Sequence, residues 1–459
     1  MKIDRFMIAA PKSGSGKTMI ICAMLQLLKG RGKKVASYKC GPDYIDPMFH
    51  RKVLDVPSKN LDTFFTDERT TMQLFTDGRA DGDFAVLEGV MGLYDGLGGI
   101  YEQGSSYHLA KVTHTPIILV VDAKGMGKSV LALIAGFLQY DTQHLIKGVL
   151  LNRMSKGYYD IIKPLIEQEL SLKVVGYFPE QKDIMLESRH LGLVMPDELD
   201  DIKEQLCEIT DRLEKTIDME VLLDIAAEAE EIGGCGNADR DDHQTINIGC
   251  IKNEFTQNVK TDCETQYQTT KIVNIKQMRI KSEDDTVNIA VAMDEAFCFY
   301  YEDNLRLLEK YGAKLQYDTE LPDNCDALLI GGGYPELYAK ELSENISMRN
   351  SIKTAFKNGL PTVAECGGFM YLHTYIHNIC KENAGVQDHV LTWLELWMGS
   401  AISKVSWSGL DILNWKKNIA IFCHRMKRSG HMNFIIMTAT ITDRTVLRSN
   451  RLQAESMIV

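Results

Sequence analysis

The sequence predicts an α/β chain with a parallel-sheet domain followed by a second, incomplete α/β domain, and three observations support this fold class. Strand-length apolar runs alternate with stretches of helical periodicity through the first 200 residues. A glycine-rich segment, PKSGSGKT at 11–18, lies between the first such run and the first helical stretch. The alternation stops in a polar stretch at 233–284 and resumes at 287. Because alternating strands and helices are typical of doubly wound sheets, we expect a second α/β domain to begin near residue 286.

The elements follow from the spacing of apolar residues. In the first domain the expected strands are residues 6–10, 35–38, 84–87, 117–121 and 148–151, and the expected helices are 18–28 and 130–139. In the second domain we expect strands at 287–293, 327–330 and 361–364, and a helix at 301–311. The predicted boundaries are a first domain over 1–200, a helical segment and polar linker over 201–285, a second domain over 286–376, and a tail over 377–459.

Composition and charge exclude several classes of protein. Hydrophobic residues make up 45% of the chain and charged residues 25%, which is typical of globular proteins. A net charge of -12 argues against non-specific attraction to nucleic acid or to an anionic membrane. No signal peptide and no spanning apolar run are evident, and the 11 cysteines are scattered without a CxxC pair. We therefore expect a cytoplasmic protein with neither nucleic acid nor membrane as partner, whereas its oligomeric state stays open.

The PKSGSGKT segment predicts a phosphate-binding loop between a strand and a helix. Gly14 and Gly16 allow backbone N–H groups to turn toward phosphate oxygens at a helix N-terminus. Lys17 is expected to meet the β- and γ-phosphates, and Thr18 to ligate Mg²⁺. Pro11 replaces the usual first glycine, so the loop is a variant form. A mere glycine-rich turn is the structural alternative, but ATP with Mg²⁺ is the expected ligand.

Acidic residues follow two other predicted strands. Glu88 ends the run at 84–87, at the strand end where such sheets bind ligands, and a buried glutamate satisfied by helix N–H groups is the alternative. Asp43 and Asp46 lie in KCGPDYIDP at 39–47, a loop fixed by two prolines and a glycine. These aspartates are candidates to bind Mg²⁺ or substrate, and equally to be solvated turn residues or a helix N-cap.

Several motifs in register carry a family resemblance over about the first 376 residues. They are PKSGSGKT, KCGPDYIDP, LEGVMGLYDG at 87–96, RHLGLVMP at 189–196, GGGYPE at 331–336 and AECGGFMYL at 364–372. In order and spacing the chain resembles the cobyrinate a,c-diamide synthase family. The resemblance implies a first domain similar to dethiobiotin synthetase and a second of the class I glutamine amidotransferase type. It also implies ATP-dependent amidation of the a and c acetate groups of cobyrinate, a corrin precursor, with ammonia from L-glutamine.

The resemblance also implies roles for individual residues. The phosphate-binding residues would be Lys12, Ser13, Gly14, Ser15, Gly16, Lys17 and Thr18. Asp46 and Glu88 would serve Mg²⁺ and the acyl phosphate, together with Thr18. Asp43, Tyr44 and Asp95 are the substrate candidates, and Asn152 with Arg153 are nucleotide contacts by analogy alone.

Cys366 has the sequence context of a nucleophile on a sharp strand-to-helix turn. It follows the apolar run at 361–364 and precedes two glycines, so its sulfur would be exposed at a helix N-terminus. Residues 331–333 are expected to help form an oxyanion pocket. A lone cysteine is more often a core residue, but both motifs together favour the glutaminase nucleophile.

The histidine partner that such a cysteine needs is missing from its expected place. The resemblance implies a HEFHY-like segment near the C-terminus, and none occurs. The downstream histidines outside that pattern are His373, His377, His389, His424 and His431, and all four tryptophans fall in the same tail, at Trp393, Trp397, Trp407 and Trp415. Back-translation read from the third base of each codon permits HEFHYYD from 431–437, RFGY from 408–412 and MVGVLDG from 392–399. We interpret the tail as a reading-frame change between His373 and Thr392; the alternative is a divergent tail with another histidine as base.

Three functions stay open at this level. The first is an ATP-dependent amidoligase whose glutaminase half is impaired but which still accepts free ammonia. The second is the same reaction on hydrogenobyrinate or nickel-sirohydrochlorin. The third is a defective remnant that binds nucleotide without turnover. A partitioning ATPase is disfavoured because GPDYIDP and the cysteine turn would have no role in it.

Overall fold

The computed structural model describes residues 2–77, 82–181, 199–232, 287–317, 320–382, 385–392, 397–403 and 437–438, with side chains as far as residue 373. The RHLGLVMP motif, the polar stretch at 233–284, and the tail's tryptophans and other histidines lie outside the described residues or side chains.

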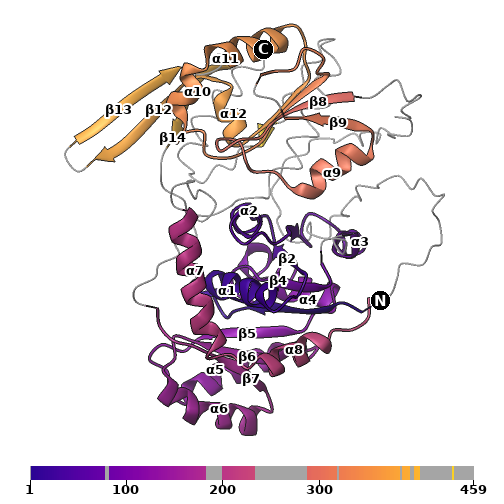
Figure 1. The fold of residues 1–459 in the computed structure, drawn as a ribbon, viewed down its shortest axis with the longest axis vertical. Helices are drawn as coiled ribbons and strands as arrows, with labels where there is room; N and C mark the ends of the chain where they lie inside the picture. Colours follow the sequence, from indigo (N-terminus) through magenta and orange to yellow (C-terminus); the bar gives the residue numbers. More distant parts are fainter. Residues whose placement is uncertain are drawn as a thin grey trace, which may run out of the picture. The chain divides into compact units, whose positions relative to one another are not determined.

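The first domain is built on a seven-stranded sheet in which all neighbouring strands are parallel (Figure 1). Its strands are β1 (Asp4–Ala9), β2 (Val35–Cys40), β3 (Ser58–Leu61), β4 (Phe84–Glu88), β5 (Ile117–Asp122), β6 (Ile146–Asn152) and β7 (Lys173–Phe178), in the order β3-β2-β4-β1-β5-β6-β7. The five predicted strands are confirmed within a few residues. The sequence analysis missed β3, which is short and polar, and β7 at the opposite edge.

Helices cover both faces of this sheet. They are α1 (Lys17–Gly30), α2 (Ile45–Lys52), α3 (Glu68–Asp77), α4 (Ser106–Val112), α5 (Ser129–Tyr140), α6 (Lys156–Leu170), α7 (Leu199–Glu214) and α8 (Met219–Ala227). Alternate residues of β1 enter different cores: Phe6 and Ile8 pack with α1, α7 and α8, whereas Met7 and Ala9 pack with α3 to α6. Both faces of a central parallel strand are therefore apolar.

The helical segment predicted to follow the first domain packs into the core of that domain. Leu206, Ile209 and Leu213 of α7 are fully buried, and they join the core cluster that α1 forms with the sheet. The buried Arg5 of β1 donates to the backbone oxygen of Glu230 at 2.8 Å, just after α8. The first domain therefore extends to Ile232. Apolar periodicity predicts a helix, but it does not show which core the apolar face of that helix covers.

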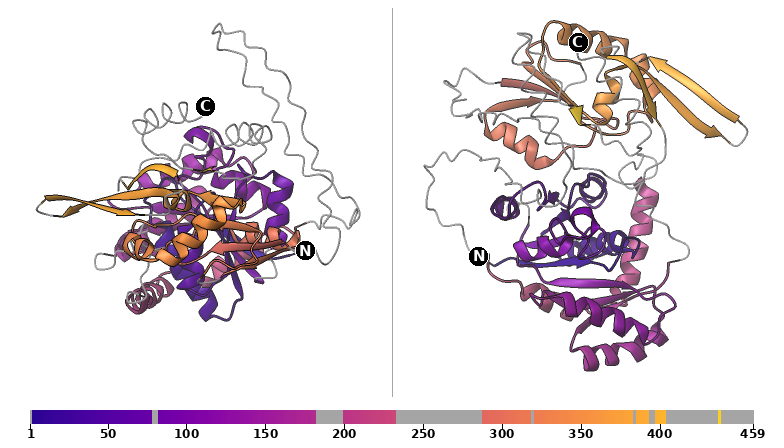
Figure 2. Two further views of the ribbon diagram at one scale, coloured as in Figure 1. Left: turned by 90° about the horizontal axis from the view of Figure 1, so that it is seen from above. Right: turned by 180° about the vertical axis from the view of Figure 1, so that it is seen from behind.

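The second domain has a five-stranded parallel sheet in the order β15-β11-β10-β8-β9. The strands are β8 (Val287–Ala292), β9 (Ala313–Gln316), β10 (Ala327–Ile330), β11 (Thr362–Glu365) and β15 (Met437–Thr438), and the helices are α9 (Glu302–Lys310), α10 (Ala339–Glu344), α11 (Ile346–Lys357) and α12 (Gly367–Tyr371). A further sheet contains β12 (His373–Glu382), β13 (Gly385–Thr392) and β14 (Trp397–Ser403), and its β12–β13 ribbon is seen clearly in Figure 2. The strands and the helix predicted for this domain are confirmed.

Candidate active site

The carboxyl ends of neighbouring strands bring the predicted site residues of the first domain together. The phosphate loop follows β1, Lys39 lies near the end of β2, Glu88 ends β4 and Asn152 ends β6. In parallel sheets this edge is where ligands bind. The topology therefore gathers residues that are more than 100 positions apart in sequence.

The phosphate loop has the backbone geometry expected for anion binding. Gly14 and Gly16 have φ of 75° and 83°, a region in which side chains are strained. Gly16 caps α1, whose first turn contains no acidic residue. Lys12, Ser13 and Gly14 are exposed around this turn. Free N–H groups at the helix N-terminus thus face the loop, as phosphate binding requires.

Residues from the far side of the sheet hold the loop in place. Asn152 Nδ2 donates to the Ser15 backbone oxygen at 2.8 Å, and Ser15 Oγ donates to the Lys12 backbone oxygen at 2.9 Å. Arg153 Nη2 donates to the Gly14 backbone oxygen at 3.2 Å, while its Nε donates to Asp122 Oδ1 at 2.8 Å. Asn152 and Arg153 thus position the loop backbone. Their predicted contact with nucleotide stays a prediction.

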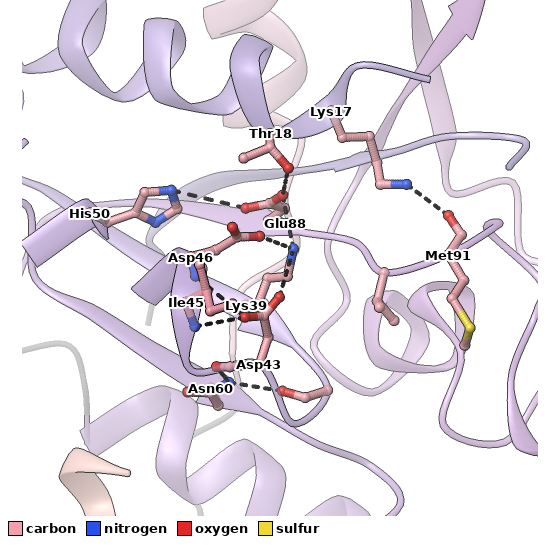
Figure 3. Close-up of polar contacts among 12 residues, drawn as sticks. Lys17, Thr18, Lys39, Asp43, Ile45, Asp46, His50, Asn60, Glu88 and Met91 are labelled. Carbon is pink, nitrogen blue, oxygen red and sulfur yellow. Dashed lines mark hydrogen bonds and ion pairs between the residues drawn. The ribbon is translucent and has the colours of Figure 1, made fainter. Parts of the chain in front are cut away.

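Asp46 and Glu88 meet at the buried ammonium group of Lys39, and Thr18 contacts Glu88 (Figure 3). Lys39 Nζ lies 2.9 Å from Glu88 Oε1 and 2.5 Å from Asp46 Oδ2. Thr18 Oγ1 donates to the same Glu88 oxygen at 3.3 Å. The structure thus brings together the three residues predicted to serve Mg²⁺, with a lysine between the two carboxylates that the sequence analysis did not single out.

Burial and charge set the protonation states of the two lysines. Burial lowers the pKa of Lys39, but the carboxylates of Glu88, Asp46 and Asp43 raise it further than burial lowers it, so the amine stays protonated. Lys17 is different, because burial and the nearby charge of Lys39 lower its pKa to about 8. A phosphate beside Lys17 would favour its charged form again.

Asp43 has a local structural role at the start of α2. Its Oδ1 accepts from the backbone N–H groups of Ile45 at 2.9 Å and Asp46 at 3.3 Å, while its Oδ2 lies 3.7 Å from Lys39 Nζ. Asp43 thus caps the first turn of α2 through Oδ1, and its Oδ2 faces the ammonium group of Lys39. Asn60 of β3 fixes the same loop by donating to the Gly41 and Asp43 oxygens at 2.8 and 2.6 Å. Tyr44, half-buried, follows at the N-cap position of α2.

The LEGVMGLYDG segment forms a turn beside the phosphate loop. Lys17 Nζ donates to the Met91 backbone oxygen at 2.7 Å, where Met91 has φ of 49°. Asp95 is exposed, and its Oδ2 accepts from the Gly92 N–H at 3.1 Å. The Lys17 ammonium group is thus hydrogen-bonded to this turn, and Asp95 hydrogen-bonds the backbone of the turn.

Cys366 forms a strained turn between β11 and α12 in the second domain. Its backbone has φ of 47° and ψ of -110°, which is unfavourable for a residue with a side chain. A Cβ on Gly367 would lie 2.7 Å from Pro335 Cδ and 3.1 Å from the Gly333 oxygen, so only glycine fits there. The N–H groups of Gly333 and Gly367 hydrogen-bond the Cys366 sulfur. Such N–H groups are of the kind that stabilise an oxyanion, and the predicted oxyanion pocket stays a prediction.

The thiol of Cys366 lacks the surroundings of an activated nucleophile. Burial raises its pKa, and the charges of Glu336 and Glu365 raise it further. His373, the one downstream histidine with a described side chain, lies with Nδ1 3.0 Å from the Phe369 oxygen. Within the described part of the chain, no hydrogen bond or ion pair joins Cys366 to a histidine.

Comparison with known proteins identifies both domains. The model of the CobQ/CobB/MinD/ParA nucleotide binding domain matches residues 6–194, and that of the CobB/CobQ-like glutamine amidotransferase domain matches residues 288–416. Cobyrinate a,c-diamide synthase of Listeria innocua is 36% identical over 376 residues, covering 81% of this chain and 74% of that relative. The chain belongs to the cobyrinate a,c-diamide synthase family.

Two other relatives of the cobyrinate a,c-diamide synthase family support this assignment. The enzyme of Thermoplasma volcanium is 37% identical over 380 residues, covering 81% of this chain and 73% of its own. The enzyme of Clostridium tetani is 34% identical over 432 residues, covering 92% of this chain and 86% of its own. The predicted α/β fold is confirmed, and the family assignment makes the chain a ligase that uses ATP and glutamine for amidation. Among the described helices, none is long and apolar enough to cross a membrane.

Proposed function

We propose that the first domain amidates the a and c acetate carboxylates of cobyrinate through acyl phosphates. The convergence of the phosphate loop with Thr18, Glu88 and Asp46 supports this proposal. A carboxylate is a poor acceptor for ammonia until one oxygen becomes a phosphate leaving group. The γ-phosphoryl group passes from ATP to the carboxylate oxygen and ADP leaves. Ammonia then forms the C–N bond, the C–O bond to phosphate breaks, and nitrogen loses a proton.

The residues around Glu88 fit a magnesium ion. Glu88 Oε1 lies 3.3 Å from the Thr18 hydroxyl, so a buried carboxylate oxygen and a hydroxyl oxygen meet at the start of α1. No cluster of three or more acidic, histidine or cysteine ligands exists in the described ranges, but magnesium with phosphate needs only one or two carboxylates. Thr18, Glu88 and Asp46 would hold the ion. When bound, Mg²⁺ neutralises charge on the transferring phosphoryl group.

The remaining side chains have binding roles in this proposal. Lys17 and Lys12 bind the phosphates of ATP, and Lys39 holds the Asp46 and Glu88 carboxylates together through its ammonium group. Asp43, Tyr44 and Asp95 contact the corrin substrate. The described cysteines are all free, which fits a reaction in a reducing cytoplasm.

We further propose that glutamine is used poorly by this chain. Cys366 has the turn and the N–H groups of a glutaminase nucleophile, but its thiol pKa is raised. A reading-frame change in the tail accounts for the missing histidine. Resequencing the codons for residues 370–459 checks this directly: a shift that restores RFGY and HEFHY would make the natural protein glutamine-dependent, and confirmation of the sequence would leave the glutaminase half broken.

Product analysis by mass spectrometry tests the synthetase proposal. The full chain is incubated with cobyrinate, ATP, Mg²⁺ and ammonium, and we expect the monoamide and diamide to accumulate. Glu88→Gln should lower the rate by about a hundredfold or more, whereas Glu68→Gln, at an exposed position, should leave it unchanged. Nucleotide binding without any amide would contradict the proposal, and faster turnover of hydrogenobyrinate or nickel-sirohydrochlorin would change the substrate.

A further inference from the structure

Two buried polar atoms face each other behind the carboxylate cluster (Figure 3). His50 Nε2 and Glu88 Oε2 are 4.0 Å apart, and neither has a hydrogen-bond partner within the described part of the chain. The two residues are 0% and 1% exposed. Because an unsatisfied buried polar atom is costly, two of them in opposition need an explanation that space filling does not supply.

The helix α2 delivers His50 to this position. Asp46 and His50 are four residues apart, so they project from the same face of α2. Asp46 reaches Lys39 at 2.5 Å, and His50 points its Nε2 at the neighbouring carboxylate of Glu88. One face of α2 thus directs the Asp46 carboxylate toward Lys39 and the His50 ring toward Glu88.

Two serine hydroxyls lie within hydrogen-bond distance of the other ring nitrogen of His50, Nδ1. Nδ1 of His50 lies 3.1 Å from Ser37 Oγ and 3.4 Å from Ser58 Oγ. A neutral imidazole carries one N–H, and a serine hydroxyl can donate to the other nitrogen. An N–H on Nε2 would face a carboxylate oxygen that can only accept. The opposite tautomer would place a lone pair against that oxygen, so the Nε2–H form is favoured.

We propose that His50 is a positioning residue whose Nε2–H donates to Glu88 Oε2 and thereby directs Glu88 Oε1 toward Thr18 and the phosphate loop. The inference rests on the proposed Mg²⁺ role of Glu88. The separation of 4.0 Å is longer than a hydrogen bond. Such contacts are often long in a ligand-free site and tighten when the complex forms.

Nucleotide binding as a function of Mg²⁺ tests the role of His50. Binding of a non-hydrolysable ATP analogue to the full chain is measured by calorimetry for the wild type, His50→Phe and His50→Gln. We expect His50→Phe to raise the Mg²⁺ concentration for half-maximal binding by about tenfold or more, with Mg²⁺-free binding unchanged. His50→Gln keeps an N–H donor near the same place, so it should restore most of the effect.

The outcomes separate this inference from the proposed function. If Mg²⁺ strengthens binding of the ATP analogue equally in the wild type and in His50→Phe, the role of His50 is contradicted but the metal site is not. If Mg²⁺ does not strengthen binding in the wild type, the proposed metal site is contradicted as well. Equal losses in both variants would also overturn the role of the N–H donor.

Nitrogen NMR gives a second test that does not depend on the phenylalanine variant folding. In protein labelled with ¹⁵N-histidine, the His50 signal is identified by its absence in His50→Gln. We expect the Nε2–H tautomer, and an Nδ1–H tautomer would overturn the inference.

Discussion

Lys39 pairs with two carboxylates at a buried position. Its ammonium group lies 2.9 Å from Glu88 and 2.5 Å from Asp46, and its side chain is 6% exposed. Burying a charge is costly unless it is paired. The carboxylates in turn keep the lysine protonated by raising its pKa, so the three groups depend on one another before any ligand arrives.

Replacing Lys39 by methionine tests this mutual dependence. The change leaves two buried carboxylates facing each other without a cation, so we expect the free energy of unfolding to fall by about 3–5 kcal/mol. Urea unfolding followed by circular dichroism measures it. The control is Lys29→Met, which breaks an exposed ion pair with Asp55 and should leave stability nearly unchanged. Equal effects of the two variants would contradict this view of Lys39.

Cys366 should react slowly at neutral pH. Its pKa is raised by burial and by two nearby glutamates, so less thiolate is present at neutral pH than in an ordinary cysteine. We expect its alkylation by iodoacetamide to be slow at neutral pH and to speed up as the pH is raised, measured by peptide mass spectrometry. Cys207 on α7 is exposed and should react faster at pH 7. Faster reaction of Cys366 would instead indicate an activated nucleophile.

At the scale of residues, the sequence predicted the groups but not their partners. Thr18, Asp46 and Glu88 were expected to meet, and they do. Lys39 begins the KCGPDYIDP motif and His50 follows it by three residues, but neither was singled out, because their partner Glu88 lies on another strand. The sequence left Asp43 with two possible roles, as a helix cap or as a ligand of Mg²⁺ or substrate. Its contacts with the N–H groups of Ile45 and Asp46 show that it caps α2.

The loop between β1 and α1 depends on an element from across the sheet. Asn152 at the end of β6 holds the Ser15 backbone, and a Cβ on Gly16 would collide with the Asn152 amide. The shape of the phosphate loop therefore results from tertiary contact as well as from its glycines.

Gly16→Ala should damage nucleotide binding. Alanine at φ of 83° is strained, by about 1–3 kcal/mol, and its methyl group would displace Asn152. We expect ATP affinity, measured by calorimetry, to fall by about tenfold or more. Gly30→Ala is a matched control, because a Cβ there meets nothing within 4 Å. Wild-type affinity in Gly16→Ala would contradict the role of this glycine.

At the scale of elements, apolar periodicity predicted the central strands well and the edges poorly. The edge strand β3 has the sequence SKNL, which carries no apolar run. The residues of α7 and α8 were predicted as a helical segment outside the first domain, because pattern alone cannot show that Leu206 and Ile225 complete the core of that domain.

At the scale of the whole molecule, the chain joins a synthetase half in which Thr18, Asp46 and Glu88 lie together to a glutaminase half in which Cys366 lacks a described histidine partner. The family models match 6–194 and 288–416, so both halves could be predicted from their motifs. The second match runs to residue 416 and so overlaps the tail that the sequence analysis set apart at 377–459. The histidine and tryptophan side chains of this tail lie outside the described part of the structure.

The most direct test compares two nitrogen sources in one preparation of the full chain. Amide formation from cobyrinate and ATP is followed with saturating ammonium and, separately, with saturating glutamine. We predict turnover with ammonium, and a glutamine-supported rate lower by about a hundredfold or more, because a cysteine without its base loses a factor of that size. Equal rates with both sources would show an intact glutaminase, and no amide with ammonium would contradict the retained synthetase.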